Sequence, residues 1–187
     1  NYCLTCHSAS YMRYNRMGKD LGLTDEQVKN SLMFASEKVG ETMTIAMRPD
    51  DAKKWFGSIP PDLSVISRAR GADWLYSYFQ TFYVDDKKVM GTNNLTLKNV
   101  GMPHVLWQDQ GYLQKGTNGE LTHLSEGELT KDEYDEMARD LVNFLAYIGE
   151  PSKIQRLAIG KWVLIYLALF FFVAYPLKKI IWKDITK

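Results

Sequence analysis

The sequence predicts a mostly α-helical domain with long loops, followed by one transmembrane helix near the C-terminal end. Three observations lead to this prediction: two capping boxes each open a helical run, residues from Val84 to about Thr130 lack clear periodicity, and residues 162–177 carry no charge. A chain of 187 residues can bury one sizeable core with an appendage. The formal net charge of +1 gives no global basic field, so we expect no nucleic-acid partner.

Two short helices are predicted in the first third of the chain. Residues 24–27, TDEQ, have the form of a capping box and open a helix through Met33. Asp50 or Asp51 can cap a second helix, which Gly57 would close.

Two more helices are predicted between residues 60 and 83. The stretch Pro60-Pro61-Asp62 stops the chain and restarts it as a helix. After Gly71, the run 72–83 (ADWLYSYFQTFY) is long enough for a further helix. Its many aromatic side chains leave a strand as the alternative.

The pattern weakens between Val84 and Thr130, where asparagines, glycines and a proline interrupt the chain. We expect extended loops with little regular structure, of a length that is usually functional. Residues 130–133, TKDE, form a second capping box. It opens an amphipathic helix that Gly149 and Pro151 end.

Residues 157–177 are predicted to cross a membrane. The uncharged part, WVLIYLALFFFVAYPL, covers roughly 24 Å at ~1.5 Å per residue, and the hydrocarbon core is ~30 Å thick. The preceding apolar residues, with Lys161 reaching toward the interface, close this gap. A buried core helix is the alternative, but the segment has no polar face. We expect residues 151–156 to be a linker and residues 178–187 a tail.

Both cysteines of the chain lie in one short stretch, Cys3-Leu-Thr-Cys6-His7. A thioredoxin-like redox pair would follow a strand of a βαβ unit, and a zinc site would need four ligands at paired spacing. Covalent haem attachment uses every residue of the stretch, because the two thiols bond to the haem and the adjacent imidazole is an axial iron ligand. The sequence therefore predicts one covalently bound haem c and a cytochrome c-like domain over residues 1–150.

The haem motif also predicts the orientation in the membrane. Covalent haem is attached outside the bacterial cytoplasm or in the mitochondrial intermembrane space, so the haem domain lies outside and the tail inside. Lysines after the predicted span agree with this orientation through the positive-inside rule, but basic residues also precede the span and weaken that signal. Because the cofactor uses both thiols, we expect no disulfide.

The sequence determines the second axial ligand less clearly than the first, His7. Met102 lies in an irregular segment, NVGMPH, where Gly101 permits close approach and Pro103 stiffens the backbone. Met47 also has a proline nearby, and His104 would give a bis-imidazole site of lower potential. On the residues alone Met102 ranks first, with Met47 and His104 as alternatives.

The chain resembles the cytochrome c1 family in its proteobacterial form, the haem subunits of the ubiquinol–cytochrome c oxidoreductase (cytochrome bc1) complex. The resemblance covers nearly the whole chain, through CLTCHS, RYNR, PPDLSVISRARG, NVGMPHVLW and a terminal span ending in WKDITK. It implies thioether links at Cys3 and Cys6, His7 as the proximal ligand and Met102 as the distal ligand. The segment around Met47 matches a family stretch that does not ligate.

The same resemblance implies further contacts with the haem. Arg70 matches the family's partner of a haem propionate, and Pro60 and Pro61 match prolines of the haem pocket. The family often has a tyrosine after that arginine. The stretch is shorter here, so Trp74 or Tyr76 would take this place, and Trp74 is our candidate.

The resemblance finally implies an electron carrier of the bacterial plasma membrane. It would accept electrons from the Rieske iron–sulfur subunit and pass them to a c-type cytochrome, beside the cytochrome b subunit and in a dimeric complex. The complex is a quinol–cytochrome c reductase, whereas this chain alone would transform no substrate. A free-standing anchored cytochrome c and a haem-based gas sensor are the alternatives. Because the family carries a helical segment before the haem motif, we expect the numbering to begin inside the mature protein.

Overall fold

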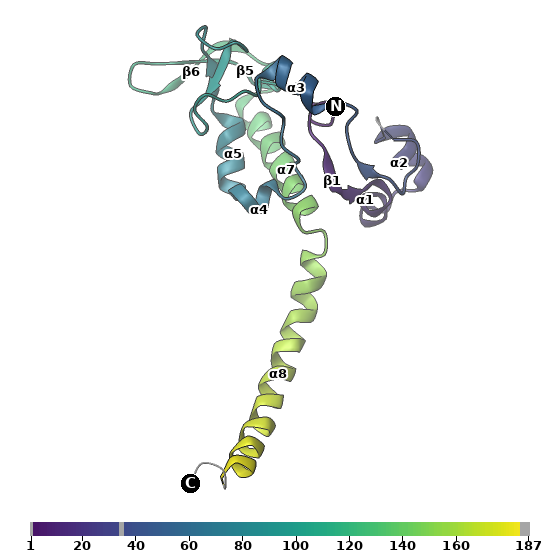
Figure 1. The fold of residues 1–187 in the computed structure, drawn as a ribbon. Helices are drawn as coiled ribbons and strands as arrows, with labels where there is room; N and C mark the ends of the chain where they lie inside the picture. Colours follow the sequence, from purple (N-terminus) through teal and green to yellow (C-terminus); the bar gives the residue numbers. More distant parts are fainter. Residues whose placement is uncertain (1, 34–35, 184–187) are drawn as a thin grey trace. The chain divides into compact units, whose positions relative to one another are not determined.

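The computed structural model describes residues 2–33 and 36–183. The chain forms two compact units, Asn1–Gly149 and Glu150–Lys187. Over the described residues, the first unit contains helices α1–α7 and three antiparallel two-stranded sheets, and the second contains helix α8 (Figure 1). The fold is therefore mostly α-helical with one long C-terminal helix, as the sequence predicts.

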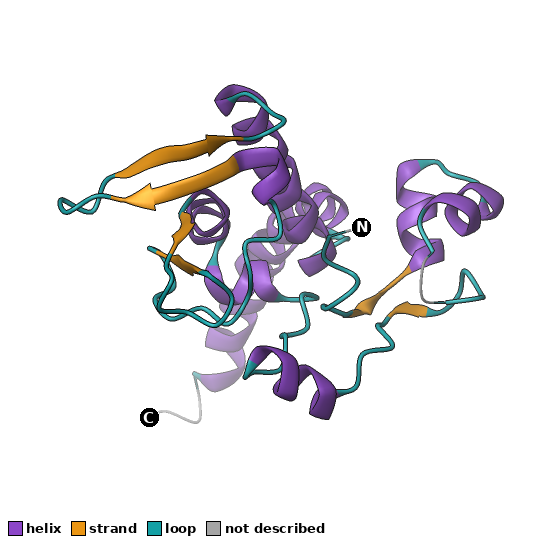
Figure 2. Cartoon of the chain, turned by 90° about the horizontal axis from the view of Figure 1, so that it is seen from above, coloured by secondary structure: helices purple, strands orange, loops and turns teal. Residues whose placement is uncertain are grey.

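The first elements of the chain were not predicted. Strand β1 (Ala9–Arg13) leads directly into helix α1 (Tyr14–Leu21), and β1 pairs antiparallel with the short strand β2 (Thr42–Met43). Figure 2 shows these elements with helix α2 as one group of the first unit. Their inward side chains, such as Met12 and Tyr14, are fully buried and join the main core.

Helices α2 (Asp25–Ser31) and α3 (Pro49–Phe56) occupy the two positions predicted for short helices. The capping box of α2 is confirmed, because the Gln27 amide donates to Thr24 Oγ1 at 3.3 Å and the Thr24 amide donates to Gln27 Oε1 at 2.9 Å. The prediction that an aspartate caps α3 is wrong. Arg48 is the N-cap, since the fixed φ of Pro49 suits the first helical position.

Helices α4 (Ile66–Arg70) and α5 (Ala72–Gln80) follow the two prolines. The helix restarts at Ile66, later than predicted, because a turn held by Asp62 intervenes. The aromatic run divides: α5 ends before Thr81, and Phe82–Val84 forms strand β3. The helix predicted to residue 83 is thus too long, and the strand alternative holds for its last residues.

The prediction of loops from residue 84 to 130 is only partly correct. Strand β4 (Thr92–Asn94) pairs with β3, helix α6 spans Trp107–Gln110, and β5 (Gly111–Lys115) and β6 (Leu121–Glu126) form a hairpin. The hairpin turn is closed by backbone hydrogen bonds between the residues 116 and 120 and between 119 and 116. The remaining segments, including residues 95–106, are irregular.

Helix α7 (Lys131–Gly149) supplies much of the core. Its capping box is confirmed, because the Thr130 amide donates to Glu133 Oε2 at 2.9 Å and the Glu133 amide donates to Thr130 Oγ1 at 3.4 Å. The helix packs its apolar face against α4 and α5. The buried residues of that face are Tyr134, Ala138, Val142, Leu145 and Ile148.

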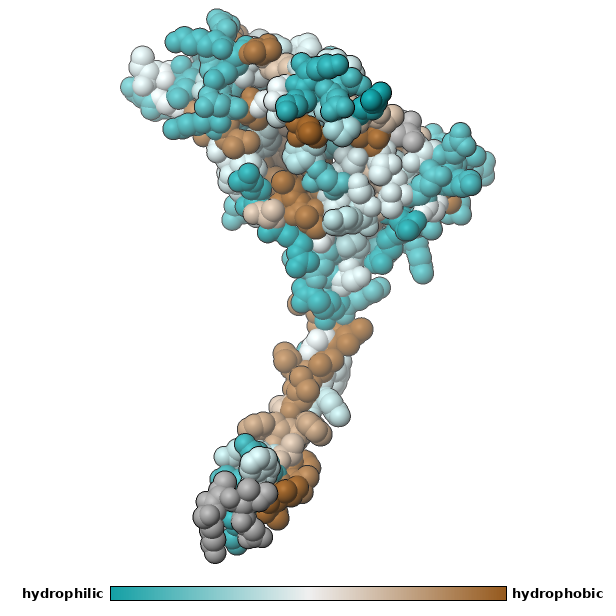
Figure 3. All heavy atoms as spheres, in the orientation of Figure 1, coloured by the Kyte–Doolittle hydropathy of each residue, from teal (hydrophilic) through white to brown (hydrophobic). Residues whose placement is uncertain are grey.

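The second unit is dominated by helix α8 (Lys153–Trp182), the one helix among the described residues that is long and apolar enough to cross a membrane. Its side chains are exposed, and Figure 3 shows the hydrophobic surface along it. Its 30 residues span ~45 Å, more than the ~30 Å hydrocarbon core, so helix continues into the expected linker 151–156 and tail. Residues 184–187 of that tail lie outside the described part.

Candidate functional site

One cavity in the first unit gathers every residue that the sequence analysis assigned to the cofactor. The residues come from the N-terminal stretch, the proline segment, helices α4 and α5, and the irregular segment before α6. They are Cys3, Cys6, His7, Pro60, Pro61, Arg70, Trp74 and Met102. The rest of the lining is mostly apolar and includes Leu141 and Leu145 of α7.

The cysteine motif forms a tight turn at this cavity. The amides of Cys6 and His7 both donate to the Cys3 carbonyl oxygen, at 3.1 and 2.8 Å. The two cysteines are not joined by a disulfide, and burial raises the pKa of the Cys3 thiol. The turn therefore brings two thiols and an imidazole to one wall of the cavity.

The imidazole of His7 is held by a main-chain oxygen. His7 Nδ1 lies 2.7 Å from the carbonyl oxygen of Pro61, which can only accept a hydrogen bond, so Nδ1 carries the proton. In the neutral ring this tautomer has its lone pair on Nε2, the nitrogen that can bind a metal. Metal-binding histidines usually donate their other ring N–H in this way.

The proline segment is fixed in turn by the Asp62 carboxylate. Asp62 Oδ2 accepts from the amide and hydroxyl of Ser10, at 3.0 and 2.6 Å, and Oδ1 accepts from the amide and hydroxyl of Ser64. Burial opposes ionisation, but these hydrogen bonds outweigh it and lower the pKa of Asp62. The carboxylate thus joins strand β1 to the turn that presents Pro61 to His7.

Met102 is the methionine that the structure brings to the same cavity. The preceding Gly101 lies at a crowded point, because an added Cβ would lie 2.8 Å from Ser58 Oγ and 3.3 Å from the Phe56 oxygen. The hydroxyl of Tyr78 donates a hydrogen bond to Met102 Sδ at 3.2 Å. Burial raises the pKa of Tyr78, which keeps this donor protonated.

The two alternative ligands lie elsewhere. Met47 is not part of the cavity lining. His104 faces a second hollow with Thr92 and Trp107, and its ring stacks on Phe82 with 5.0 Å between centroids. Burial lowers the pKa of His104 to about 4, so the ring is neutral at pH 7.

Arg70 and Trp74 lie together at the cavity. The guanidinium carbon of Arg70 is 4.9 Å from the centroid of the Trp74 ring, and Trp74 stacks on Tyr78 with 5.2 Å between centroids. No salt bridge engages Arg70 within residues 2–33 and 36–183. Tyr76, the other candidate from the sequence, does not line the cavity.

Sequence reasoning missed the contribution of Tyr78 and of the α7 leucines. Tyr78 lies in a run of aromatic residues, and nothing in that run marks which ring faces the sulfur of Met102, 24 positions away. Leu141 and Leu145 follow the helical period of α7, but that period indicates only a buried face. No local signal distinguishes cavity lining from core packing.

These residues fit a haem of the c type. The cavity offers an apolar lining, two thiols on one wall, an imidazole with a free Nε2, a thioether and a guanidinium. Among common cofactors, this set of donors matches iron porphyrin. Fold and site together are those expected of a cytochrome with one candidate membrane helix.

Comparison with known proteins identifies the family. The Cytochrome C1 family matches residues 1–185, and the chain belongs to this family of electron carriers, which implies a haem c cofactor. Cytochrome c1 of Allochromatium vinosum is 46% identical over 196 residues, covering 99% of this chain and 80% of that protein. The ammonia monooxygenase gamma subunit of Nitrosomonas europaea is 47% identical over 186 residues, covering 98% and 79%. Cytochrome c1 of Rhodospirillum rubrum is 25% identical over 227 residues, covering 98% and 77%.

Proposed function

We propose that this chain is the haem subunit of a bacterial cytochrome bc1 complex. In this role it accepts electrons from the Rieske iron–sulfur subunit and passes them to a c-type cytochrome, within a quinol–cytochrome c reductase. The observation that carries the proposal is the meeting of His7 and Met102 at one apolar cavity beside both thiols. The family match and the A. vinosum relative support it.

The chain's own residues would hold the cofactor in defined ways. The thiols of Cys3 and Cys6 would form the thioether links, and His7 Nε2 and Met102 Sδ would bind the iron. When bound, the haem supplies a centre that takes up and releases one electron. With an imidazole and a thioether both available as iron ligands, no exogenous ligand would be needed, which suits a carrier rather than a gas sensor.

Other residues would set the surroundings of the cofactor. The Arg70 guanidinium at the cavity would pair with a haem carboxylate, where a charge-assisted hydrogen bond is stronger than a neutral one. Pro60, Pro61 and Trp74 line the pocket and exclude water, which keeps the local dielectric low. The lowered pKa of Asp62 keeps its carboxylate ionised at neutral pH, so the turn that holds His7 stays fixed.

We assign the membrane topology from the same reasoning. Residues 1–150 lie in the periplasm, residues 157–177 cross the inner membrane once, and residues 178–187 lie in the cytoplasm. Helix α8 supports a single span by its length and apolar composition. The span would hold the haem domain beside the cytochrome b subunit, in a dimeric complex.

A substitution of the proposed distal ligand tests the haem site. In Met102→Leu, we expect the absorption spectrum to become high-spin and the midpoint potential to fall, because one strong-field ligand is lost. Met47→Leu is the matched control and should leave both unchanged. A pyridine haemochrome spectrum of the denatured chain tests for two thioether bonds. If Met102→Leu keeps the native spectrum, or if both thiols are free in the purified protein, the proposed site is wrong.

The partner complex needs a separate experiment. The relative named as an ammonia monooxygenase gamma subunit is as similar to this chain as the relative named cytochrome c1. That name favours a second candidate, an electron carrier associated with a monooxygenase. Purification from membranes in mild detergent separates the two. Recovery with cytochrome b and a Rieske protein supports the first role, and recovery with monooxygenase subunits would replace it by the second.

A further inference from the structure

Three side chains spaced four residues apart form a continuous row along the cavity. The Arg70 guanidinium carbon lies 4.9 Å from the Trp74 ring centroid. The Trp74 ring stacks on Tyr78, with 5.2 Å between centroids and 10° between planes. The Tyr78 hydroxyl then donates to Met102 Sδ at 3.2 Å. The row thus leads from a cation at the cavity to the sulfur of the proposed distal ligand.

The position of Tyr78 is determined from several sides. Tyr78 is 7% exposed, and its ring forms T-shaped pairs with Phe79 and Phe82, with centroids 5.7 and 5.0 Å away. The Asn94 side-chain amide donates to the Tyr78 carbonyl oxygen at 2.7 Å, which also fixes the main chain. A ring held by stacking, by two edge contacts and by its backbone has little freedom to redirect its hydroxyl.

The contact also has a direct chemical consequence for the sulfur. A thioether sulfur is a weak hydrogen-bond acceptor, so a buried hydroxyl donating to it is a specific arrangement. The hydrogen bond uses one lone pair and leaves the other for a metal. It also withdraws electron density from sulfur, which weakens donation to iron and disfavours the ferric state more than the ferrous state. Hydrogen bonds to metal ligands are one of the ways in which a protein tunes a haem potential.

We propose that Tyr78 is a positioning residue for Met102. Its hydroxyl orients the thioether sulfur toward the cavity and raises the reduction potential of the haem, while Trp74 holds the Tyr78 ring in place. This inference rests on the proposed ligation by Met102, and adds a residue that determines how strongly that ligand binds.

The test uses the full chain with its covalent haem, purified in detergent with its partners. In Tyr78→Phe the ring and its packing remain and only the donor is lost. We expect a lower midpoint potential in a redox titration and a changed near-infrared charge-transfer band of the thioether-ligated ferric haem. Tyr134→Phe is the matched control, because Tyr134 is also buried and donates to the Phe79 oxygen at 2.9 Å but does not line the cavity. It should leave potential and band unchanged.

A second variant keeps the test decisive if Tyr78→Phe fails to assemble. Incorporation of 3-fluorotyrosine at position 78 keeps the hydroxyl and makes it a stronger donor, so the potential should rise instead of fall. The inference is overturned if both Tyr78 variants behave like the Tyr134→Phe control while Met102→Leu changes the spectrum. If Met102→Leu also leaves the spectrum unchanged, the proposed ligand itself has failed, which is a different result.

Discussion

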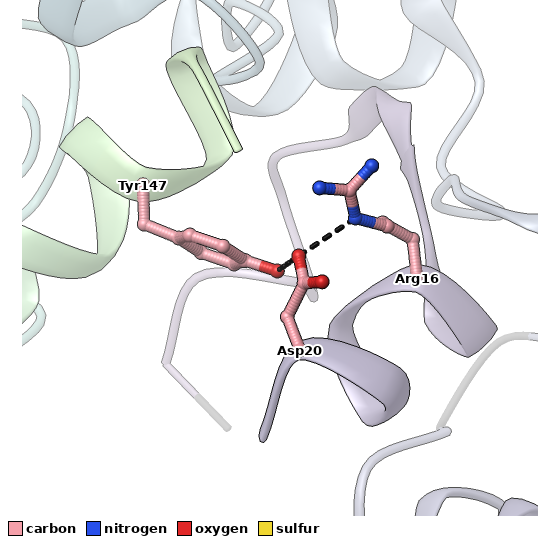
Figure 4. A network of polar contacts seen from close by, with 3 residues as sticks. All are labelled: Arg16, Asp20 and Tyr147. Carbon is pink, nitrogen blue, oxygen red and sulfur yellow. Dashed lines mark hydrogen bonds and ion pairs between the residues drawn. The ribbon is translucent and has the colours of Figure 1, made fainter. Parts of the chain in front are cut away.

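The hydroxyl of Tyr147 donates a hydrogen bond to Asp20 Oδ2 at 2.7 Å and so connects helix α7 to helix α1 (Figure 4). Arg16 Nε donates to the same oxygen at 2.7 Å from within α1. The hydrogen bond from Arg16, followed by that from Tyr147, lowers the pKa of Asp20. Burial and the hydrogen bond to Asp20 raise the pKa of Tyr147 to about 12, so the phenol stays a neutral donor. This carboxylate links two parts of the domain that are 127 positions apart in sequence.

We expect Tyr147→Phe to lower the free energy of unfolding by about 1 kcal/mol near pH 7, the usual net contribution of one hydrogen bond. The folded-state pKa of Asp20 is depressed, so its contribution is present above the ordinary value of 3.8 and is lost as the pH falls below it. Urea unfolding of the full chain, followed by haem absorption between pH 7 and 3, measures both effects. Tyr11→Phe is the control, because Tyr11 is 80% exposed. Equal stability of the Tyr147 and Tyr11 variants at pH 7 would contradict the prediction.

The elements that the sequence predicted carry local signals. Both capping boxes place a hydroxyl three residues before a side chain that returns to the N-cap amide, and both form as predicted. The cysteine motif is a short turn, and the spacing of its residues follows from the chemistry of haem attachment and not from the fold. Signals of this kind depend on residues within one helical turn, so they can be recognised without knowing the fold.

The elements that the sequence analysis missed depend on distant contacts. Strand β6 is exposed along most of its length, so it lacks the alternation of apolar and polar residues that marks a strand. Its pairing with β5 stabilises it instead. The contacts of Tyr78 and of Asp62 likewise join residues from separate segments. Sequence reasoning therefore found the candidate donors that line the cavity but missed the residues that position them.

Asp62→Ala should destabilise the turn that presents Pro61 to His7. Removing the carboxylate leaves the amides and hydroxyls of Ser10 and Ser64 without their acceptor. Because the site is partly exposed and water can replace the carboxylate, we expect a loss of about 1–2 kcal/mol in urea unfolding. Asp25→Ala is the control, because Asp25 is exposed at the start of helix α2.

The same variant tests the function of the turn. If Asp62 positions His7 through Pro61, resonance Raman or electron paramagnetic resonance of the ferric protein should show a changed imidazole ligand in Asp62→Ala. A less stable protein with an unchanged imidazole signature would restrict Asp62 to a role in stability.

Gly101→Ala should disturb the segment that carries Met102. The new Cβ would lie 2.8 Å from Ser58 Oγ, which can rotate away, and 3.3 Å from the Phe56 main-chain oxygen, which cannot. Overpacking of this kind costs about 1–3 kcal/mol, and the lower end applies here because the closest neighbour is a small side chain. Gly40→Ala is the control, since among the described residues no atom beyond its chain neighbours lies within 4 Å of the added Cβ. Adding Ser58→Ala to Gly101→Ala should restore part of the lost stability, and no recovery would show that the clash is not the cause.

Arg70→Gln should lower the midpoint potential of the haem. A nearby positive charge favours the reduced state, which carries one more electron, so its removal makes reduction less favourable. No salt bridge neutralises Arg70 within the described residues. Its guanidinium lies over Trp74 at the cavity, where its charge can act on the haem. Because Arg70 is exposed, solvent and salt screen its charge. We therefore expect the free energy of one-electron reduction to change by at most about 1 kcal/mol. Arg68→Gln is the matched control, since Arg68 is also exposed on α4 but does not line the cavity.

Redox titrations of the Arg70→Gln and Arg68→Gln variants at low and high ionic strength should show a difference in midpoint potential that shrinks with added salt. Equal potentials for both variants at low salt would remove Arg70 from the haem site.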